Sequence, residues 1–384
     1  MGETAHKSYK YKLQPTPEQE RALELVLWRC RTLYNTALEQ RIFLYRQRGV
    51  SLSRYSQEAE LKDLRAALPD YAAVHSHVLQ DVLARLDKAY QAFFRRIQAG
   101  QTPGYPRFQG RNRYHSFTYK EYGNGARRDN GFLVLSKIGR IAVRWSRPIE
   151  GIPKTVTLSK EADGWYVCFS CADVPTQPLP PTGRETGIDV GLKVFLITSE
   201  GGVVDNPRHH RKAEKQLKKA HRRVSRRKKG SRRCAKAVRL LAKKHQQIRR
   251  QRQDFHHKTA LALVREYDTI YLEDLRVANL VRNQHLAKSI SDAGWAQFRT
   301  ILECKAGYAG KRVVAVPPAY TSQDCSGCGT RIPKSLSVRT HVCASCGLVL
   351  DRDENAARNI LWAGQALRGL AGLPAGTNRE SVAL

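Results

Sequence analysis

Acidic residues and long apolar runs are scarce in this chain of 384 residues. The 34 Asp and Glu residues are outnumbered by 67 Lys and Arg residues, which gives a formal net charge of +33. A balance this basic is typical of proteins that bind a polyanion. No stretch approaches the roughly 18 uncharged apolar residues that cross a membrane. Residues 1–20 also lack the apolar core of a signal peptide. We therefore expect a cytoplasmic protein that binds nucleic acid and contacts no membrane.

The chain still has the means to build folded cores. Hydrophobic residues make up 41% of it, and its length predicts two or three domains. No arrangement typical of a tyrosine or serine recombinase is visible, which disfavours a simple transposase. Without an export signal, the nine cysteines indicate free thiols and metal ligands rather than disulfides.

Four of these cysteines form two closely spaced pairs near the C-terminus. Cys325 and Cys328 are followed after 14 residues by Cys343 and Cys346. Two such pairs can hold one zinc ion tetrahedrally through four thiolates. The gap is just below the roughly 15–20 residues usual in zinc ribbons, which does not prevent the site from closing. We therefore expect one structural Zn²⁺ ion. The remaining cysteines are expected to be free thiols: Cys30, Cys168, Cys171, Cys234 and Cys304.

One segment carries most of the excess positive charge. Residues 207–252 contain 21 Lys and Arg residues but a single acid, Glu214. Thin apolar stripes on either side of Gly230-Ser231 predict two long helices joined by a short turn. A solvated charged helix is the ordinary alternative, but helices this rich in like charge repel themselves unless phosphates neutralise them. The candidate nucleic-acid contacts are Arg222, Arg223, Arg226, Arg227, Lys228, Lys229, Arg232 and Arg233.

Helical patterns dominate roughly residues 15–105. Thr16, Pro17 and Gln19 form a helix start, with a capping residue, Pro in the first position and Gln in the third. Apolar residues then recur at helical spacing, and a second long helix ends near the Pro103–Pro106 turn.

Strand patterns flank this helical block. Residues 8–14 alternate, and short apolar runs return after residue 130, where Asp163-Gly164 is a hairpin turn. Prolines from Pro175 to Pro181 mark a linker. The sequence therefore predicts one β-rich domain, residues 1–14 and 115–180, with the helical block 15–114 inserted.

Three acids stand on separate elements beyond the linker. Asp189 lies inside an apolar strand pattern, Glu273 ends another, and Asp353 opens a helical pattern. A buried acid is unfavourable unless it binds something, although a turn-forming Asp189 and a helix-starting Glu273 are the ordinary alternatives. Carboxylates suit Mg²⁺, and two such ions about 4 Å apart can hydrolyse a phosphodiester. The residues alone do not choose between Asp351 and Asp353.

Several motifs, taken together and in order, resemble a known family. They are Gly187–Gly191, Leu272–Leu275, Ser289–Trp295, the two cysteine pairs and Asp351–Ile360. The family is TnpB, the RNA-guided nucleases encoded by bacterial and archaeal insertion sequences and related to type V CRISPR effectors. The resemblance covers essentially the whole chain.

This resemblance implies a multidomain α+β fold. A β-rich wedge domain would hold an inserted helical recognition domain. A ribonuclease H-like RuvC nuclease domain would follow at residues 183–320 and 349–364, interrupted by a zinc ribbon at 321–348. The small, polar residues 365–384 are expected to be a disordered tail.

The resemblance also implies an activity. A guide RNA from the transposon end would direct Mg²⁺-dependent cleavage of double-stranded DNA beside a short target-adjacent motif. The matching triad is Asp189, Glu273 and Asp353, which would hold two Mg²⁺ ions, and the protein is expected to be a monomer within the ribonucleoprotein. Gln80 matches a position that faces the target-adjacent motif and can read adenine; an ordinary polar surface residue is the alternative.

A non-catalytic, RNA-guided DNA-binding repressor on the same scaffold is the alternative function. The intact acid triad disfavours it, because a binder has no need to keep three such acids. Trp295 is expected to pack in the core. His256 and His257 are expected to face RNA or solvent.

Overall fold

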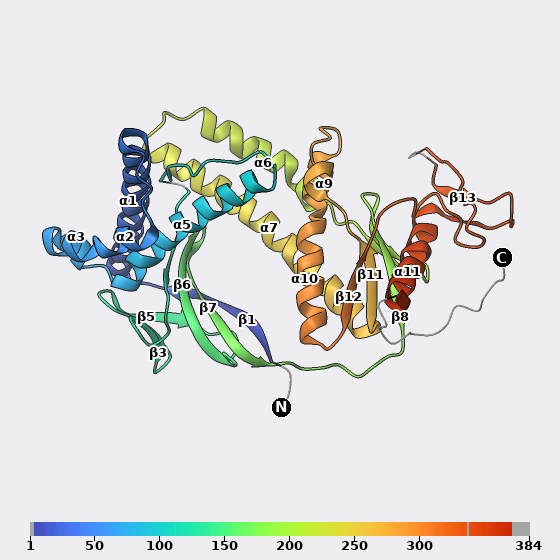
Figure 1. Cartoon of the computed structure of the whole chain (residues 1–384), viewed down its shortest axis with the longest axis horizontal. Helices are drawn as coiled ribbons and strands as arrows, with labels where there is room; N and C mark the ends of the chain where they lie inside the picture. Colours follow the sequence, from blue (N-terminus) through green and yellow to red (C-terminus); the bar gives the residue numbers. More distant parts are fainter. Residues whose placement is uncertain (1–3, 112, 336–337, 371–384) are drawn as a thin grey trace. The chain divides into compact units, whose positions relative to one another are not determined.

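The chain folds into two units, residues 1–175 and 176–384. The computed structural model (Figure 1) describes residues 4–111, 113–335 and 338–370. The first unit ends where the expected proline-rich linker begins. Residues 176–180, which the sequence assigns to the wedge domain, instead bond to the second unit, since the N–H groups of Gln177 and Leu179 donate to Tyr308 and Ala309 at 3.2 and 3.0 Å. No helix among the described residues is long and apolar enough to cross a membrane.

In the described part of the first unit, seven strands form one antiparallel sheet in the order β2-β6-β7-β1-β5-β4-β3. The N-terminal strand β1 (Thr4–Gln14) lies between β5 (Gly139–Arg144) and β7 (Gly164–Pro175). The two segments expected to share a β-rich domain therefore pair in one sheet. The other strands are β2 (Ser116–Tyr119), β3 (Ala126–Asp129), β4 (Phe132–Leu135) and β6 (Ile152–Glu161). The predicted hairpin is confirmed, although its two turn residues are Ala162 and Asp163, since Gly164 already pairs with Glu161 as the first residue of β7.

Two long helices pack together in the same unit, α1 (Pro17–Arg48) and α5 (Ser76–Gln98). The predicted start of α1 is confirmed: Gln19 N–H donates to the Thr16 hydroxyl at 3.2 Å, and Thr16 N–H donates to the Gln19 side chain at 3.0 Å. Gly49 ends α1 with φ of 64°, a left-handed conformation that glycine adopts without strain. Three short helices lie between them in the chain, α2 (Arg54–Ala59), α3 (Leu61–Ala67) and α4 (Pro69–Ala72).

The described strands of the second unit form a five-stranded sheet in the order β10-β9-β8-β11-β12, and a two-stranded one, β13-β14. In the larger sheet, β8 pairs with β9 and β9 with β10 in antiparallel fashion, whereas β8–β11 and β11–β12 are parallel. The strands are β8 (Glu185–Val190), β9 (Val194–Thr198), β10 (Val203–Asp205), β11 (Thr269–Glu273), β12 (Arg312–Val316), β13 (Thr340–Val342) and β14 (Val349–Asp351).

Helices cover both faces of this sheet. Figure 1 shows it between α10 (Trp295–Tyr308) and α11 (Arg352–Leu370). A Cβ atom on Gly187 of β8 would lie 2.1 Å from the carbonyl oxygen of Ala357, so only glycine allows α11 this close. The opposite face holds the main core, where Ile188 and Phe195 pack with residues of α10 and of α7 (Arg232–Glu266). Trp295 is buried in this core, which confirms its predicted packing role.

The expectation of a disordered tail from residue 365 is wrong for residues 365–370, because α11 continues to Leu370. Arg368 forms a buried ion pair with Glu185 at the start of β8 and donates to the Tyr271 hydroxyl at 2.8 Å. Gln365 donates to the same Glu185 carboxylate at 3.1 Å. The rest of the expected tail, residues 371–384, lies outside the described residues.

His256 is buried, contrary to the expectation that it faces RNA or solvent, whereas His257 is exposed. Its ring stacks on Phe195 at 5.5 Å between centroids, and its Nε2 donates to the carbonyl oxygen of Ala293 at 2.9 Å. Burial lowers the pKa of His256 to about 4. The imidazole is therefore neutral in the folded protein at pH 7.

Acid should destabilise the protein through this histidine. Between an unfolded pKa of about 6.5 and the folded pKa of about 4, the unfolded chain takes up a proton that the folded chain refuses. The free energy of unfolding should therefore decrease as the pH is lowered through this window, by on the order of 3 kcal/mol. Urea unfolding at pH 7, 5.5 and 4 measures this loss. His256→Gln keeps a donor for Ala293 without titrating there, so an equally steep loss in this variant would contradict the assignment.

Candidate active site and nucleic-acid interface

Three carboxylates gather at the carboxyl ends of β8 and β11, beside the start of α11. Asp189 lies two residues beyond Gly187 in β8, on the face of the sheet that α11 covers. Glu273 lies two residues after Tyr271 in β11. The ring of Tyr271 packs toward α11, so Glu273 lies on the same face of the sheet. Asp353 lies in the first turn of α11. The fold thus brings the three acids singled out from the sequence to one place.

The acids influence one another's ionisation. Burial raises the pKa of Asp189 to about 8, and the nearby carboxylates of Glu273 and Asp353 add to the shift. Burial also raises the pKa of Glu273, although the hydrogen bond that the Thr321 hydroxyl donates to its carboxylate at 2.6 Å acts in the opposite direction. Carboxylates clustered in this way repel one another when they are ionised, unless a cation neutralises their negative charge. Their oxygen donors suit Mg²⁺.

The spacing of these acids differs from that of a closed metal cage. Among the described residues, only the four cysteines bring three or more candidate ligand atoms within 4.8 Å of one another. The carboxylates are more widely spaced, which fits Mg²⁺, since this ion keeps several water ligands and binds phosphate as well as protein.

Asp351 and Asp353 have different surroundings. The exposed Asp351 accepts hydrogen bonds from the N–H groups of Asp353 and Glu354 at 2.8 and 3.4 Å, as a helix cap does. Asp353 is buried, and its carboxylate accepts hydrogen bonds from Arg352 at 2.9 Å and Arg339 at 3.1 Å. The geometry therefore favours Asp353 as the third acid of the cluster and gives Asp351 a structural role.

The four C-terminal cysteines are arranged as a metal site. The Sγ atoms of Cys325 and Cys346, and those of Cys328 and Cys343, are 3.6 Å apart. Four thiolates about 2.3 Å from one zinc ion place their sulfurs about 3.8 Å apart, so the cluster has the size that zinc requires. All nine cysteines are free of disulfides.

We predict one zinc ion per chain with four sulfur ligands. Cys328→Ser should lower the zinc content, because it removes one thiolate, whereas Cys304→Ser should leave zinc bound, because Cys304 lies outside the cluster. Elemental analysis gives the stoichiometry, and X-ray absorption should give a Zn–S distance of about 2.3 Å. Zinc-free wild-type protein, or a shell dominated by oxygen, would contradict the assignment.

The basic segment forms the predicted pair of helices, α6 (His209–Ser225) and α7, joined by a short turn. The Ser231 hydroxyl caps α7 by accepting a hydrogen bond from the N–H of Cys234 at 3.1 Å. Lys244 of α7 donates to Gln216 of α6 at 2.9 Å, which links α7 to the middle of α6.

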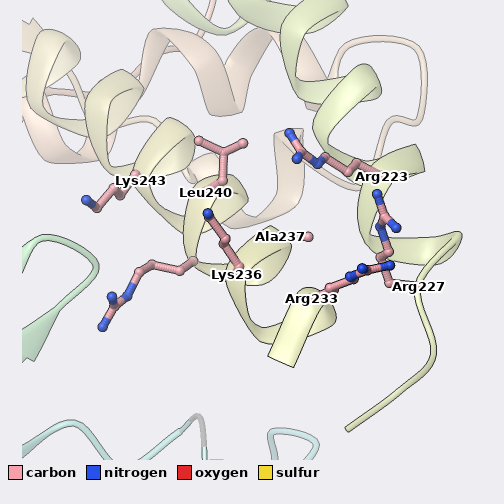
Figure 2. A pocket seen from close by; sticks show the side chains of 8 residues that line it. Arg223, Arg227, Arg233, Lys236, Ala237, Leu240 and Lys243 are labelled. Atoms are coloured by element: carbon pink, nitrogen blue, oxygen red, sulfur yellow. The ribbon is translucent and has the colours of Figure 1, made fainter. Parts of the chain in front are cut away.

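A groove of about 470 Å³ opens between these helices near the turn, and Figure 2 shows the side chains that line it. Six of the eight lining residues are basic, and none of the six has an acidic ion-pair partner in the part of the chain that the structure describes. Such a concentration of uncompensated charge favours a phosphate backbone. The lining residues are Arg223, Arg227, Arg233, Lys236, Ala237, Arg239, Leu240 and Lys243.

Sequence reasoning found part of this groove. Of the eight basic residues it proposed, three line the groove, and the other five are exposed on the same helices and turn: Arg222, Arg226, Lys228, Lys229 and Arg232. It missed Lys236, Arg239 and Lys243. These recur at intervals of three and four residues, the helical spacing that would have placed them on one face.

A missed residue, Asp292, anchors the basic hairpin. It lies in α9 (Ala287–Ala293), which follows the short α8 (Val277–Leu280). Its carboxylate accepts hydrogen bonds from the N–H groups of His210 and Arg211, at 2.9 and 3.3 Å, in the first turn of α6. Arg252 of α7 donates to the carbonyl oxygen of Ser291 at 2.9 Å. The Ser289–Trp295 motif thus holds the base of both basic helices.

Gln80 belongs to the first unit. It is half-buried near the start of α5, and its proposed contact with the target-adjacent motif stays a prediction.

Three family models match the chain. One described as "Probable transposase" matches residues 156–284, and one described as "Cas12f1-like, TNB domain" matches 295–360. A third, "Helix-turn-helix domain", matches residues 1–49. The described residues of this last segment form the strand β1 and the single helix α1, so its fold here is not a helix-turn-helix.

Relatives match over nearly the full length. A "Putative RNA-guided DNA endonuclease" of Streptomyces pristinaespiralis is 38% identical, with 95% of this chain and 91% of the relative covered. The "Putative RNA-guided DNA endonuclease InsQ" of Escherichia coli K12 is 30% identical, with 94% and 92% covered. The solved Cas12f1-sgRNA-target DNA complex shares the fold, with a TM-score of 0.56 at 16% identity and coverage of 90% and 83%. The chain belongs to the TnpB family.

Proposed function

We propose that this protein is an RNA-guided DNA endonuclease. The observation that carries the proposal is the carboxylate cluster of Asp189, Glu273 and Asp353, in a chain whose full-length relatives bear that name. A repressor would need no such cluster, in which the negative charges of Glu273 and Asp353 oppose the ionisation of Asp189. The family membership and the cluster therefore point to the same chemistry.

Two Mg²⁺ ions are the metals that this donor set suits, held by Asp189 and Glu273 from the sheet and Asp353 from α11. When bound, such ions activate water and stabilise the leaving oxygen of a phosphodiester. The chain's own residues then orient the site. Thr321 fixes one oxygen of Glu273, and the guanidinium groups of Arg339 and Arg352 add positive charge beside Asp353 that suits a phosphate.

The basic groove is the proposed seat of the guide RNA, which would come from the transposon end and read the double-stranded target by base pairing. Gln80 would help to read the target-adjacent motif, and one chain per ribonucleoprotein is expected. A wedge domain with an inserted recognition domain, a RuvC nuclease domain and a zinc ribbon belong to the same proposal. The five-stranded sheet supports a ribonuclease H-like nuclease domain. Its first three strands, β8 to β10, are antiparallel, and β11 and β12 are parallel to β8.

One experiment tests the proposal directly. The protein is purified with RNA transcribed from its own locus, the RNA is sequenced, and the complex is incubated with Mg²⁺ and a plasmid library carrying randomised sequence beside the target. Cleavage restricted to plasmids with one flanking motif is the expected result. Guided binding without cleavage would favour the repressor, and cleavage that persists in EDTA would contradict the metal chemistry.

A further inference from the structure

We infer that Thr321 is a positioning residue for Glu273, and that the zinc ribbon thereby sets the geometry of the catalytic carboxylates. This inference rests on the proposed function. It concerns the segment 321–326, which leads into the first cysteine pair. Neither the acid pattern nor the cysteine spacing assigns Thr321 a role.

The contact between Thr321 and Glu273 is short and sheltered. The Thr321 hydroxyl donates to Oε1 of Glu273 at 2.6 Å, and Thr321 is only 8% exposed. This hydrogen bond to one oxygen restricts rotation of the carboxylate and leaves the other oxygen for a metal ion. A hydrogen bond of this kind to a metal-binding carboxylate orients it and tunes its affinity.

Thr321 is itself held by α11. Asn359 donates to the carbonyl oxygens of Thr321 and Asp324, at 2.8 and 2.6 Å. Asn355 donates to the same Asp324 carbonyl at 2.8 Å and accepts from the N–H of Ser326 at 2.9 Å. Asn355 is fully buried. Two asparagines, one helical turn apart, therefore fasten the start of the ribbon to the helix that also carries Asp353.

The ribbon also meets the cluster through Arg339, which lies between the cysteine pairs. Its guanidinium donates to Asp353 at 3.1 Å, and its carbonyl oxygen accepts from the N–H of Arg352 at 2.7 Å. Two of the three carboxylates, Glu273 and Asp353, are thus bonded to ribbon residues. A zinc ion that orders the ribbon would also order these two ligands.

The test compares two changes at one position. Thr321→Val preserves shape but removes the hydroxyl, whereas Thr321→Ser preserves the hydroxyl. Mn²⁺ serves as a probe, and its binding to the zinc-loaded protein without nucleic acid is measured by electron paramagnetic resonance. Thr321→Val should weaken Mn²⁺ binding by roughly 10- to 100-fold, and Thr321→Ser should bind close to wild type. In the ternary complex, Thr321→Val should raise the Mg²⁺ concentration for half-maximal cleavage without changing target affinity.

Asn359→Ala tests the second half of the inference, because it loosens Thr321 without touching its hydroxyl. It should weaken Mn²⁺ binding while zinc content stays at one per chain. Wild-type Mn²⁺ affinity in Thr321→Val, or an equal loss in Thr321→Ser, would overturn the positioning role of the hydroxyl. Wild-type affinity in Asn359→Ala would overturn the link to the ribbon. If the wild-type protein cleaves no guided target, the proposed function fails, while the Mn²⁺ comparison still decides the role of Thr321.

Discussion

Asp189→Asn is expected to abolish target cleavage while guide-RNA and target binding persist. Glu273→Gln and Asp353→Asn should do the same, because each removes one charged metal ligand and keeps the size of the side chain. The cleavage rate of a preformed ternary complex should fall by at least roughly 1,000-fold. Rates are measured at saturating Mg²⁺, with RNA and DNA affinities measured in parallel.

Asp351→Asn is the matched control, since it changes the same residue type two positions from Asp353. Asn caps helices as well as Asp does, so this variant should still cleave. If Asp351→Asn were inactive and Asp353→Asn active, the third ligand would be Asp351.

Stability separates lost chemistry from lost structure in these variants. Without metal, the carboxylates of Glu273 and Asp353 help to raise the pKa of Asp189 to about 8, so they repel its charged form. Glu273→Gln removes one of these charges, so it should leave thermal stability in EDTA unchanged or higher. Asp353→Asn also gives up the ion pairs of Asp353 with Arg339 and Arg352, so it should melt lower. An inactive Glu273→Gln that melts well below the wild type would not support the catalytic assignment.

Signals between near neighbours in the sequence were the easiest to predict. The capping box of Thr16 and Gln19 and the turn at Gly230-Ser231 depend on residues a few positions apart, and both form as expected. The acids were also identifiable, because an Asp inside an apolar strand pattern has few structural uses. The choice of Asp353 over Asp351 needed three dimensions, since it depends on which side chain caps α11 and which one is buried.

Contacts across long stretches of chain were not predictable from one sequence. Arg368 looked like part of a small, polar tail until its partner Glu185, 183 residues earlier, placed it on the sheet. Thr321 meets Glu273 across 48 residues, and Asn355 meets Ser326 across 29. His256 has a polar side chain, yet it is buried because the fold surrounds it with Phe195 and Phe298. In each case the partner, not the residue type, decides the role.

Neutralising the basic groove is expected to have the second largest effect, on guide-RNA affinity. If each of four cations contacts one phosphate, their replacement by Gln should reduce the slope of log affinity against log salt by about three units. That corresponds to roughly 100- to 1,000-fold weaker binding at about 0.15 M salt. Filter binding across a salt series measures both. The four residues are Arg223, Arg227, Arg233 and Lys236.

An equal change of charge nearby serves as the control for the groove. The control residues are exposed on the same helices and turn but do not line the groove: Arg226, Lys228, Lys229 and Arg232. This set should reduce the slope less, because only the groove concentrates its cations around one volume. Equal reductions would mean that the whole hairpin tip binds RNA diffusely. An unchanged slope in the groove variant would instead leave the segment a solvated charged surface, and the guide RNA would have to be held elsewhere in the chain.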